Sequence, residues 1–171
     1  MKNPFTMRNA PRQALRRLFI MFCPALLLLL LLKVVFSLFY VPTGSMEPTV
    51  RAGSVQLAWR LPYIIGDPAL RHGEIVAFRN DAVSDRLMLK RVIGTEGDRI
   101  DIMGGDVYVN GERLNEPYIR SNTEAYECSS FSVPEGMVFL LGDNRENSWD
   151  SRYWEKPFVP LHDIYAKLLL G

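Results

Sequence analysis

Cysteine and histidine are scarce in this chain of 171 residues, which holds only two of each. The histidines, His72 and His162, and the cysteines, Cys23 and Cys128, are too far apart to match the ligand spacing of a zinc site. Cys23 also lies inside a long apolar run, so we expect no disulfide between it and Cys128. The chain is therefore predicted to use no metal ion and no other cofactor.

Acidic residues are missing from the first part of the chain. None precedes Glu47, whereas six basic residues do: Lys2, Arg8, Arg12, Arg16, Arg17 and Lys33. The part of the chain from Glu47 onward contains the other 14 of the 20 basic residues and all 19 acidic residues, so its formal net charge is about −5. Such a domain lacks the basic surface that nucleic-acid binding requires, so we expect no nucleic-acid partner.

One long apolar run, Leu18–Tyr40, contains seven consecutive leucines. About 20 apolar residues span the ~30 Å hydrocarbon core as a helix, so 18–40 is predicted to be a single transmembrane helix. Pro24 is tolerable there, and Lys33 is near enough to the far interface to extend its amine into it. Basic residues stay on the cytoplasmic side, which makes 1–17 a cytoplasmic N-terminus and 41–171 an extracytoplasmic domain at the cell membrane.

A cleavable secretory signal peptide is the alternative interpretation of the same residues. The apolar run is long for a signal peptide, and no A-x-A cleavage site follows it before Pro42. Both features favour a retained membrane anchor.

The residues after Tyr40 show no long helical periodicity and alternate between short apolar runs and turn residues. Asn110-Gly111 after an alternating run is a strong signal for a two-residue hairpin. The fold class is thus predicted to be mainly β, with a small barrel or folded sheet after the membrane helix. The candidate strands are Val55–Trp59, Glu74–Arg79, Leu87–Gly94, Arg99–Met103, Val107–Val109, Phe131–Val133, Met137–Leu141 and Ile164–Leu168.

Three segments of this β region carry residues suited to catalysis. The first, Pro42–Pro48, contains Ser45 after the flexible Gly44, so a turn here could present the serine hydroxyl and backbone N–H to one substrate carbonyl. By itself this segment is more typical of a polar linker that leaves the membrane.

The second segment contains Lys90 among apolar residues. In a strand, Lys90 shares one face with Met88 and Val92. Burial lowers the pKa of a lysine, and lowering it enough to give a base near neutral pH costs roughly 4 kcal/mol. The commoner role of a lysine in a strand is to prevent an edge strand from pairing with another chain and aggregating. However, arginine carries most of the positive charge after Lys33, so an isolated lysine on an apolar strand favours a specific role.

The third segment, Gly142–Arg152, is a polar loop that follows the apolar strand Met137–Leu141. Asp150 and Arg152 have the spacing to pair and hold the loop, and Ser148 could hydrogen-bond a catalytic amine. Functional loops on rigid scaffolds have this composition, and so do many structural ones.

In this order, the segments resemble the bacterial type I signal peptidases, a family of Ser-Lys dyad peptidases. The matching blocks are P-[ST]-G-S-M-x-P at 42–48, G-[DE]-I-V-x-F at 73–78, K-R-V-I-G-x-x-G-D at 90–98 and G-D-N-R-x-N-S-x-D-S-R at 142–152. Departures are mild: Glu74 replaces the more usual aspartate, and Glu155-Lys156-Pro157 lengthens a short link.

The resemblance implies a membrane-bound serine endopeptidase that removes N-terminal signal peptides from exported preproteins. Ser45 would be the nucleophile and Lys90 its general base, with Thr43 and the Ser45 N–H forming the oxyanion hole. The family implies further that Ser148 orients the lysine, that the Asp150–Arg152 ion pair supports the loop, and that Gly142 lies at its start. A groove for small side chains at the −1 and −3 positions of the substrate would be lined by Phe39, Val41, Pro42, Met46, Val50, Met88 and Leu89. The implied partners are preproteins and the lipid bilayer.

Three alternatives remain at this point. One is another Ser-Lys peptidase, such as a pilin-maturation enzyme. Another is a Ser-His-Asp hydrolase that uses His72 or His162, although neither can be tied to Ser45 by sequence. The last is a membrane-tethered β domain that binds partners and has lost its catalytic activity. This alternative predicts that Ser45 or Lys90 is replaced, and both residues are present.

Overall fold

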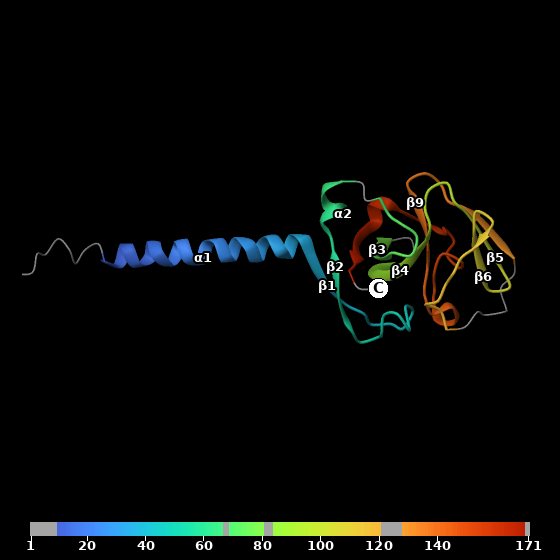
Figure 1. The fold of residues 1–171 in the computed structure, drawn as a ribbon, viewed down its shortest axis with the longest axis horizontal. Helices are drawn as coiled ribbons and strands as arrows, with labels where there is room; N and C mark the ends of the chain where they lie inside the picture. The colour runs from blue at the N-terminus through green and yellow to red at the C-terminus, as the bar shows by residue number, and fades with distance from the viewer. Residues whose placement is uncertain (1–9, 67–68, 81–83, 121–127, 170–171) are drawn as a thin grey trace, which may run out of the picture. The chain divides into compact units, whose positions relative to one another are not determined.

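The computed structural model describes residues 10–66, 69–80, 84–120 and 128–169. The chain divides into two compact units between Val35 and Phe36 (Figure 1). The first unit is the N-terminal helix, and the second, the β unit, contains all of the strands.

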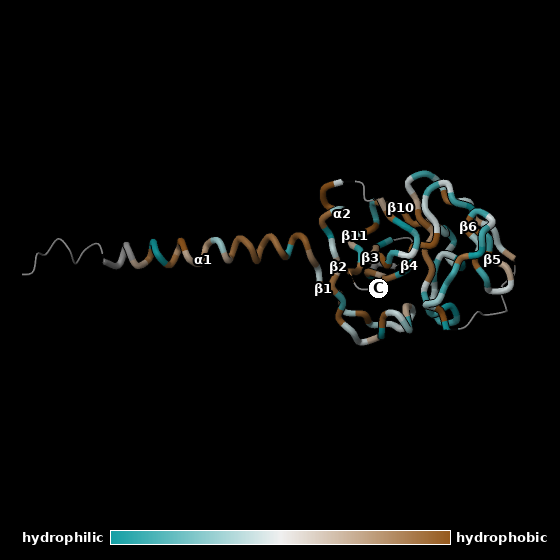
Figure 2. Tube along the Cα trace, in the orientation of Figure 1, coloured by the Kyte–Doolittle hydropathy of each residue, from teal (hydrophilic) through white to brown (hydrophobic). Residues whose placement is uncertain are grey.

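Helix α1 (Ala10–Val35) is apolar over most of its length (Figure 2). Residues 14–35 have a mean hydropathy of 2.8, and this stretch is long and apolar enough to cross a bilayer. Pro24 lies inside the helix and Lys33 in its last turn. Residues 1–9 of the predicted basic N-terminus lie outside the described residues.

The helix ends five residues before the predicted boundary at Tyr40. Residues 36–40 instead form strand β1 (Phe36–Tyr40), which pairs antiparallel with β2 (Val55–Trp59), with Leu38 opposite Leu57. Three of the five residues in β1 are aromatic, a type that favours strands when a partner strand is available. The predicted extent of the helix was therefore wrong at this end, because hydropathy alone does not distinguish the last turns of an apolar helix from an apolar strand.

The β unit contains two antiparallel sheets. The larger has the strand order β1-β2-β11-β3-β4-β9-β10, and the smaller has β7-β6-β5-β8. The fold is mainly β, as the sequence predicted. The remaining elements are α2 (Leu61–Ile65), β3 (Ile75–Asn80), β4 (Ser84–Gly94), β5 (Arg99–Met103), β6 (Asp106–Val109), β7 (Glu112–Arg113), β8 (Ser129–Ser132), β9 (Met137–Leu141), η1 (Arg145–Asn147), β10 (Phe158–Pro160), η2 (Leu161–Asp163) and β11 (Ile164–Leu168).

All eight predicted strands are present within a few residues of their expected bounds. The Asn110-Gly111 hairpin joins β6 to β7, with both residues at positive φ (54° and 86°) as a type I′ turn requires. Strands β1, β7 and β10 and the short helix α2 were not predicted. Strand β7 has only two residues and β10 only three, too few for alternation to be recognised.

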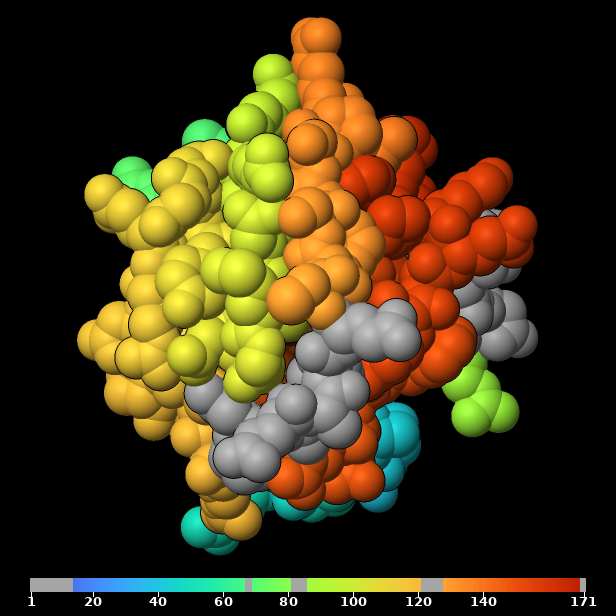
Figure 3. All heavy atoms as spheres, turned by 90° about the vertical axis from the view of Figure 1, so that its right-hand side faces the viewer, coloured from blue at the N-terminus to red at the C-terminus, as the bar shows by residue number. Residues whose placement is uncertain are grey.

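Among the described residues, three clusters of buried apolar side chains stabilise the β unit and fix the positions of its strands and loops. The first lies between β2, β3 and β11 and includes Ala58, Ala77 and Ala166; we call it cluster 1. A second cluster includes Val76, Phe78 and Val92. The third joins the two sheets through Ile93 and Phe139 on one side and Ile100 on the other. Strands β5, β6 and β8 of the small sheet lie side by side on the face seen in Figure 3.

Candidate active site

Ser45 lies on the loop that joins β1 to β2, which we call the Ser45 loop (residues 41–54). The base of this loop is closed by two backbone hydrogen bonds, from the Val41 N–H to the Ser54 carbonyl (2.9 Å) and from the Gly53 N–H to the Val41 carbonyl (2.7 Å). Val41, Met46 and Val50 are buried in cluster 1. Apolar side chains thus anchor the loop to the sheet on both sides of the serine.

The side chain of Lys90 reaches Ser45 from strand β4. Its Nζ donates a hydrogen bond to the Ser45 Oγ at 2.9 Å, and only 3% of Lys90 is exposed. Burial lowers the pKa of Lys90 to about 8, against the opposing effect of the nearby Asp150 and Asp143 carboxylates. At that pKa about a tenth of the lysine is neutral at pH 7, so the amine can take a proton from the hydroxyl.

The 142–152 loop, which connects β9 to the C-terminal strands, holds the Ser45 loop in place. The backbone N–H of Asn144 donates to the Ser45 carbonyl (3.1 Å), and the Asn144 Nδ2 donates to the Gly44 carbonyl (3.0 Å). Two consecutive carbonyls of the Ser45 loop are therefore bound by one residue. This restrains the backbone that carries the serine.

Asp150 and Arg152 form the ion pair that their spacing predicted. The Arg152 Nε and Nη2 donate to the two carboxylate oxygens at 2.7 and 2.8 Å, and Asp150 is fully buried. Asp150 also accepts the backbone N–H of Gly142 (3.0 Å), and Arg152 donates to the Arg145 carbonyl (2.9 Å). The pair ties the two ends of the 142–152 loop together.

Ser148 and Gly142 are packed against each other near the Ser45 carbonyl. A Cβ added at Gly142 would lie 2.0 Å from the Ser148 Oγ and 2.6 Å from the Ser45 carbonyl oxygen, so only glycine fits. The Ser148 Oγ is buried and makes no hydrogen bond within the described part of the chain. The expected contact with Lys90 is therefore not formed in this structure, although the hydroxyl lies beside Ser45. Thr43 is exposed on the loop, two residues before Ser45.

A protein-family model described as "Signal peptidase, peptidase S26" matches residues 14–170. The chain belongs to this signal peptidase family. It is thereby a member of a family of peptidases, enzymes that hydrolyse peptide bonds.

Several relatives carry the signal peptidase name. A probable signal peptidase I-2 of Synechocystis is 39% identical over 75% of this chain and 59% of its own length, and a signal peptidase I of Bacillus caldolyticus is 35% identical over 78% of each. The crystal structure of a signal peptidase I from Enterococcus faecalis has a TM-score of 0.51 and 29% identity, covering 59% of this chain and 97% of that one. The chain thus spans little more than half the length of the Synechocystis relative. Family membership and the apolar helix α1 together fit a membrane-anchored protein.

Most of the residues expected to form the substrate groove of this signal peptidase family member lie together. Phe39 and Leu89 pack against cluster 1, where Val41, Met46 and Val50 are buried. Met88 does not join them. It packs against the cluster of Val76, Phe78 and Val92, because neighbouring residues of β4 point to opposite faces of the sheet. Pro42 is exposed at the start of the Ser45 loop.

Sequence reasoning missed a buried ion pair next to Lys90. Arg91, next to Lys90, donates to both carboxylate oxygens of Asp143 at 2.8 and 2.6 Å, and its Nη1 donates to the Gly73 carbonyl at 2.6 Å. The Arg91 guanidinium also lies 3.8 Å from the centre of the Tyr118 ring. The signal in the sequence was that Arg91 lies in the same strand as Lys90 and that Asp143 lies in the 142–152 loop, although the two residues are far apart in the chain.

A second missed ion pair joins Arg145 to Glu116. Both side chains are buried, and two guanidinium nitrogens of Arg145 bind the carboxylate. Together with the contact between Arg91 and Tyr118, this pair fastens the segment after β7 onto the 142–152 loop. The position and binding of Asn144 were missed as well, although it lies in the G-D-N-R block.

The structure gives no support to a histidine base. His72 binds Asp98 at 2.7 Å, in a group with Thr95 and Asn110, and His162 lies near Asp163. Within the described residues, the side-chain partner of the Ser45 hydroxyl is Lys90.

Proposed function

We propose that this chain is a membrane-bound serine endopeptidase that removes N-terminal signal peptides from exported preproteins, with Ser45 and Lys90 as its catalytic dyad. The observation that carries the proposal is the 2.9 Å hydrogen bond between the Lys90 Nζ and the Ser45 Oγ in a buried setting that lowers the pKa of the lysine to about 8. Membership of the signal peptidase family supports the substrate class.

The reaction begins when neutral Lys90 takes the proton of the Ser45 hydroxyl, and the Oγ attacks the carbonyl carbon of the scissile peptide bond. The resulting oxyanion is bound by the Ser45 N–H and the Thr43 hydroxyl. Protonated Lys90 then gives its proton to the leaving nitrogen, so that the mature chain departs with a new amino terminus and an ester remains on Ser45. Lys90 next deprotonates a water molecule, whose oxygen attacks the ester carbonyl carbon. Protonated Lys90 then returns the proton to the Ser45 Oγ, and the signal peptide is released with a carboxyl terminus.

Loop restraint supports this chemistry. Asn144 binds the carbonyls of the two peptide bonds that flank the Ser45 Cα, and Gly142 allows the 142–152 loop to approach the Ser45 carbonyl closely. In the proposed reaction the Ser148 hydroxyl orients the lysine amine. Ser148 is packed against Gly142 near the Ser45 carbonyl, and the Asp150–Arg152 pair keeps this part of the loop in position. Each of these contacts keeps the nucleophile near an attack geometry.

Cluster 1 supports a preference for small apolar side chains at the −1 and −3 positions of the substrate. Met46 is fully buried and Phe39 and Leu89 cover the cluster, so the surface next to Ser45 on this side is apolar and closely packed. Such a surface accepts a small side chain and excludes a large or charged one.

Helix α1 supports a single membrane anchor, with residues 1–17 in the cytoplasm and the β unit on the extracytoplasmic side of the cell membrane. Arg12, Arg16 and Arg17 precede its apolar part, and basic residues mark the cytoplasmic end of a span. An anchor in the same bilayer as the substrate's signal segment raises the effective concentration of the two reacting groups.

The test is the cleavage of a preprotein with an A-x-A junction by the full chain in detergent or lipid. Wild type should cut after the junction, and Ser45→Ala and Lys90→Ala should not. Lys156→Ala, the same change at an exposed lysine, is the matched control and should retain wild-type activity. Full activity of Lys90→Ala would disprove the dyad, and a wild type that cuts none of several preproteins would disprove the function.

A further inference from the structure

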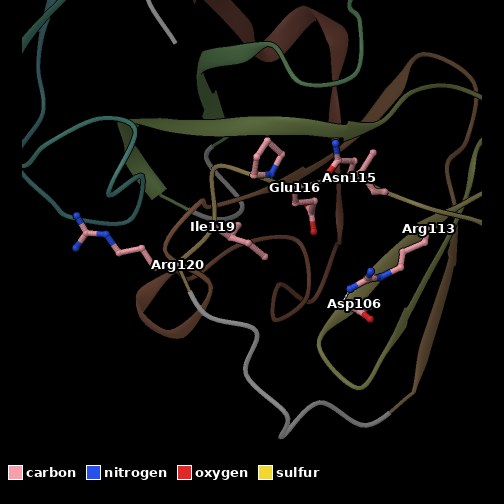
Figure 4. Close-up of a pocket in the computed structure, with 8 residues that line it drawn as sticks. Asp106, Arg113, Asn115, Glu116, Ile119 and Arg120 are labelled. Atoms are coloured by element: carbon pink, nitrogen blue, oxygen red, sulfur yellow. Dashed lines mark hydrogen bonds and ion pairs between the residues drawn. The ribbon is translucent and has the colours of Figure 1, made fainter.

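The segment that follows strand β7, residues 114–120, contacts the 142–152 loop, and we call it the Tyr118 segment. It borders an open hollow of about 630 Å³, which Glu116 lines together with Asp106 and Arg113 (Figure 4). Although Glu116 lies at this hollow, only 5% of its side chain is exposed, because its carboxylate is bound by Arg145. Glu116 and Tyr118 both reach the ion pairs next to the candidate active site.

The residues on both sides of Asn144 are held by buried ion pairs. Asp143 precedes it in the chain and accepts two hydrogen bonds from Arg91, at 2.8 and 2.6 Å. Arg145 follows it and is bound by Glu116. Asn144 itself binds two carbonyls of the Ser45 loop. The position of this residue therefore depends on how the two ion pairs are placed relative to each other.

The side chain of Tyr118 contacts both ion pairs. The centre of its ring lies 3.8 Å from the guanidinium carbon of Arg91, an arrangement that favours a cation over the face of the ring. Its hydroxyl donates a hydrogen bond to the Glu116 Oε1 at 2.8 Å. Burial and the neighbouring Glu116 charge raise the pKa of Tyr118, so the hydroxyl stays protonated at neutral pH and continues to donate.

One side chain thus connects two arginines that come from different elements. Arg91 belongs to strand β4, next to Lys90, whereas Arg145 belongs to the 142–152 loop. A displacement of either guanidinium would move one of the residues that flank Asn144. Such a displacement would reach the backbone of the Ser45 loop through the two bonds of Asn144, and small displacements of a nucleophile are costly in rate.

We propose that Tyr118 is a positioning residue, which joins the two ion pairs and thereby aligns Asn144 and, through it, the Ser45 nucleophile. Tyr118 takes no part in the proton transfers. This inference rests on the proposed function, because it concerns the same reaction at the same site.

The test measures kcat and KM of the full chain in detergent on a preprotein with an A-x-A junction. Tyr118→Leu removes the ring and the hydroxyl, so kcat should fall about tenfold while KM stays within about twofold of the wild type. Tyr118→Phe keeps the ring at Arg91 and removes only the bond to Glu116, so kcat should fall about threefold. Tyr108→Leu, at a half-buried tyrosine on strand β6, is the matched control and should keep the wild-type kcat.

A double-mutant cycle with Asn144→Ala distinguishes positioning from a general loss of stability. In the Asn144→Ala background, Tyr118→Leu should lower kcat only about threefold, because one of the two bonds that Tyr118 aligns is already absent. Two residues that act independently would give the same factor in both backgrounds. All rates are measured at a temperature at which circular dichroism shows every variant to be folded. Tyr118→Phe, which keeps the packing of the ring, provides the same cycle if Tyr118→Leu does not fold.

A wild-type kcat in either Tyr118 variant overturns the inference, and so does an equal factor in the two backgrounds. A raised KM with an unchanged kcat overturns it as well, since Tyr118 would then act on substrate binding. A wild type that cleaves no preprotein contradicts the proposed function, and this inference with it. An active wild type with an unaffected Tyr118→Leu variant contradicts the inference alone.

Discussion

Asn144 binds two consecutive carbonyls of the Ser45 loop, that of Gly44 through its side chain and that of Ser45 through its backbone N–H. Only the first of these bonds depends on the identity of the side chain. A substitution at Asn144 therefore loosens one side of the nucleophile while leaving the other bond in place.

Asn144→Ala should lower kcat by about ten- to a hundredfold, because small displacements of a nucleophile are costly. The loss of one hydrogen bond should lower the free energy of unfolding by about 1 kcal/mol. Steady-state kinetics and thermal melting of the purified variant check both values. Asn115→Ala, an exposed asparagine outside the loop, should show neither effect. A fully active Asn144→Ala would show that the backbone bond alone positions Ser45.

The pH dependence of kcat/KM should follow the ionisation of Lys90. Because burial lowers the pKa of the free enzyme's lysine to about 8, the protonated and inactive form dominates below that pH. Activity should therefore fall about tenfold per pH unit on the acid side and level off above pH 8. A rate that stays constant from pH 6 to pH 9 would contradict a lysine base.

Lys90→Met should produce a more stable protein that is inactive. The pKa of Lys90 is lower in the folded chain than the ordinary value of 10.5, so the unfolded chain binds the proton more tightly. The burial of the protonated Lys90 amine therefore lowers the free energy of unfolding of the wild type. This loss of stability has its full size below pH 8 and disappears as the pH rises from about 8 to 10.5. The variant should gain about 1–3 kcal/mol in the free energy of unfolding at pH 7, with a smaller gain at pH 10.

Denaturation of wild type and Lys90→Met at both pH values measures this gain. Lys156→Met, at an exposed lysine, provides the control for the change in composition. A variant less stable than wild type at pH 7 would mean that the contacts of the lysine with Ser45 and the nearby carboxylates outweigh its burial.

Gly142→Ala should abolish most activity. The added methyl group would lie 2.0 Å from the Ser148 Oγ and 2.6 Å from the Ser45 carbonyl oxygen, so the 142–152 loop must move away from the nucleophile. We expect kcat to fall at least about a hundredfold in a protein that is still folded by circular dichroism. Gly66→Ala, at an extended glycine with open space around it, should remain active. Normal rates in Gly142→Ala would show that this close approach is unnecessary.

Local sequence patterns predicted the strands whose apolar and polar residues alternate or whose ends carry turn residues. Val55–Trp59 and Met137–Leu141 have their predicted bounds, and Asn110-Gly111 forms its hairpin, because backbone preference and burial agree at these positions. The residue types of the proposed site were likewise visible in short blocks around Ser45, Lys90 and Asp150. Each block is contiguous, so its residue types and spacing are local properties.

Tertiary structure decided those features of the fold and the site that depend on contacts between residues far apart in the chain. Phe36–Tyr40 continues an apolar run and becomes a strand only because β2 lies beside it. Met88 and Leu89 are neighbours in sequence, but the alternation of β4 directs their side chains to different clusters. The Arg91–Asp143 and Arg145–Glu116 pairs join segments far apart in sequence, which no local pattern could connect.

The sequence by itself thus determined the class of fold, the apolar helix and the residues proposed for catalysis, because hydropathy, turn preference and side-chain chemistry are local. Only the folded chain decided that the Lys90 amine is buried within 2.9 Å of the Ser45 hydroxyl. Burial and proximity arise from the packing of β4 against the Ser45 and 142–152 loops. They lower the pKa of Lys90 and so suit it to its proposed role as a base, because removing water disfavours the charged form of the amine.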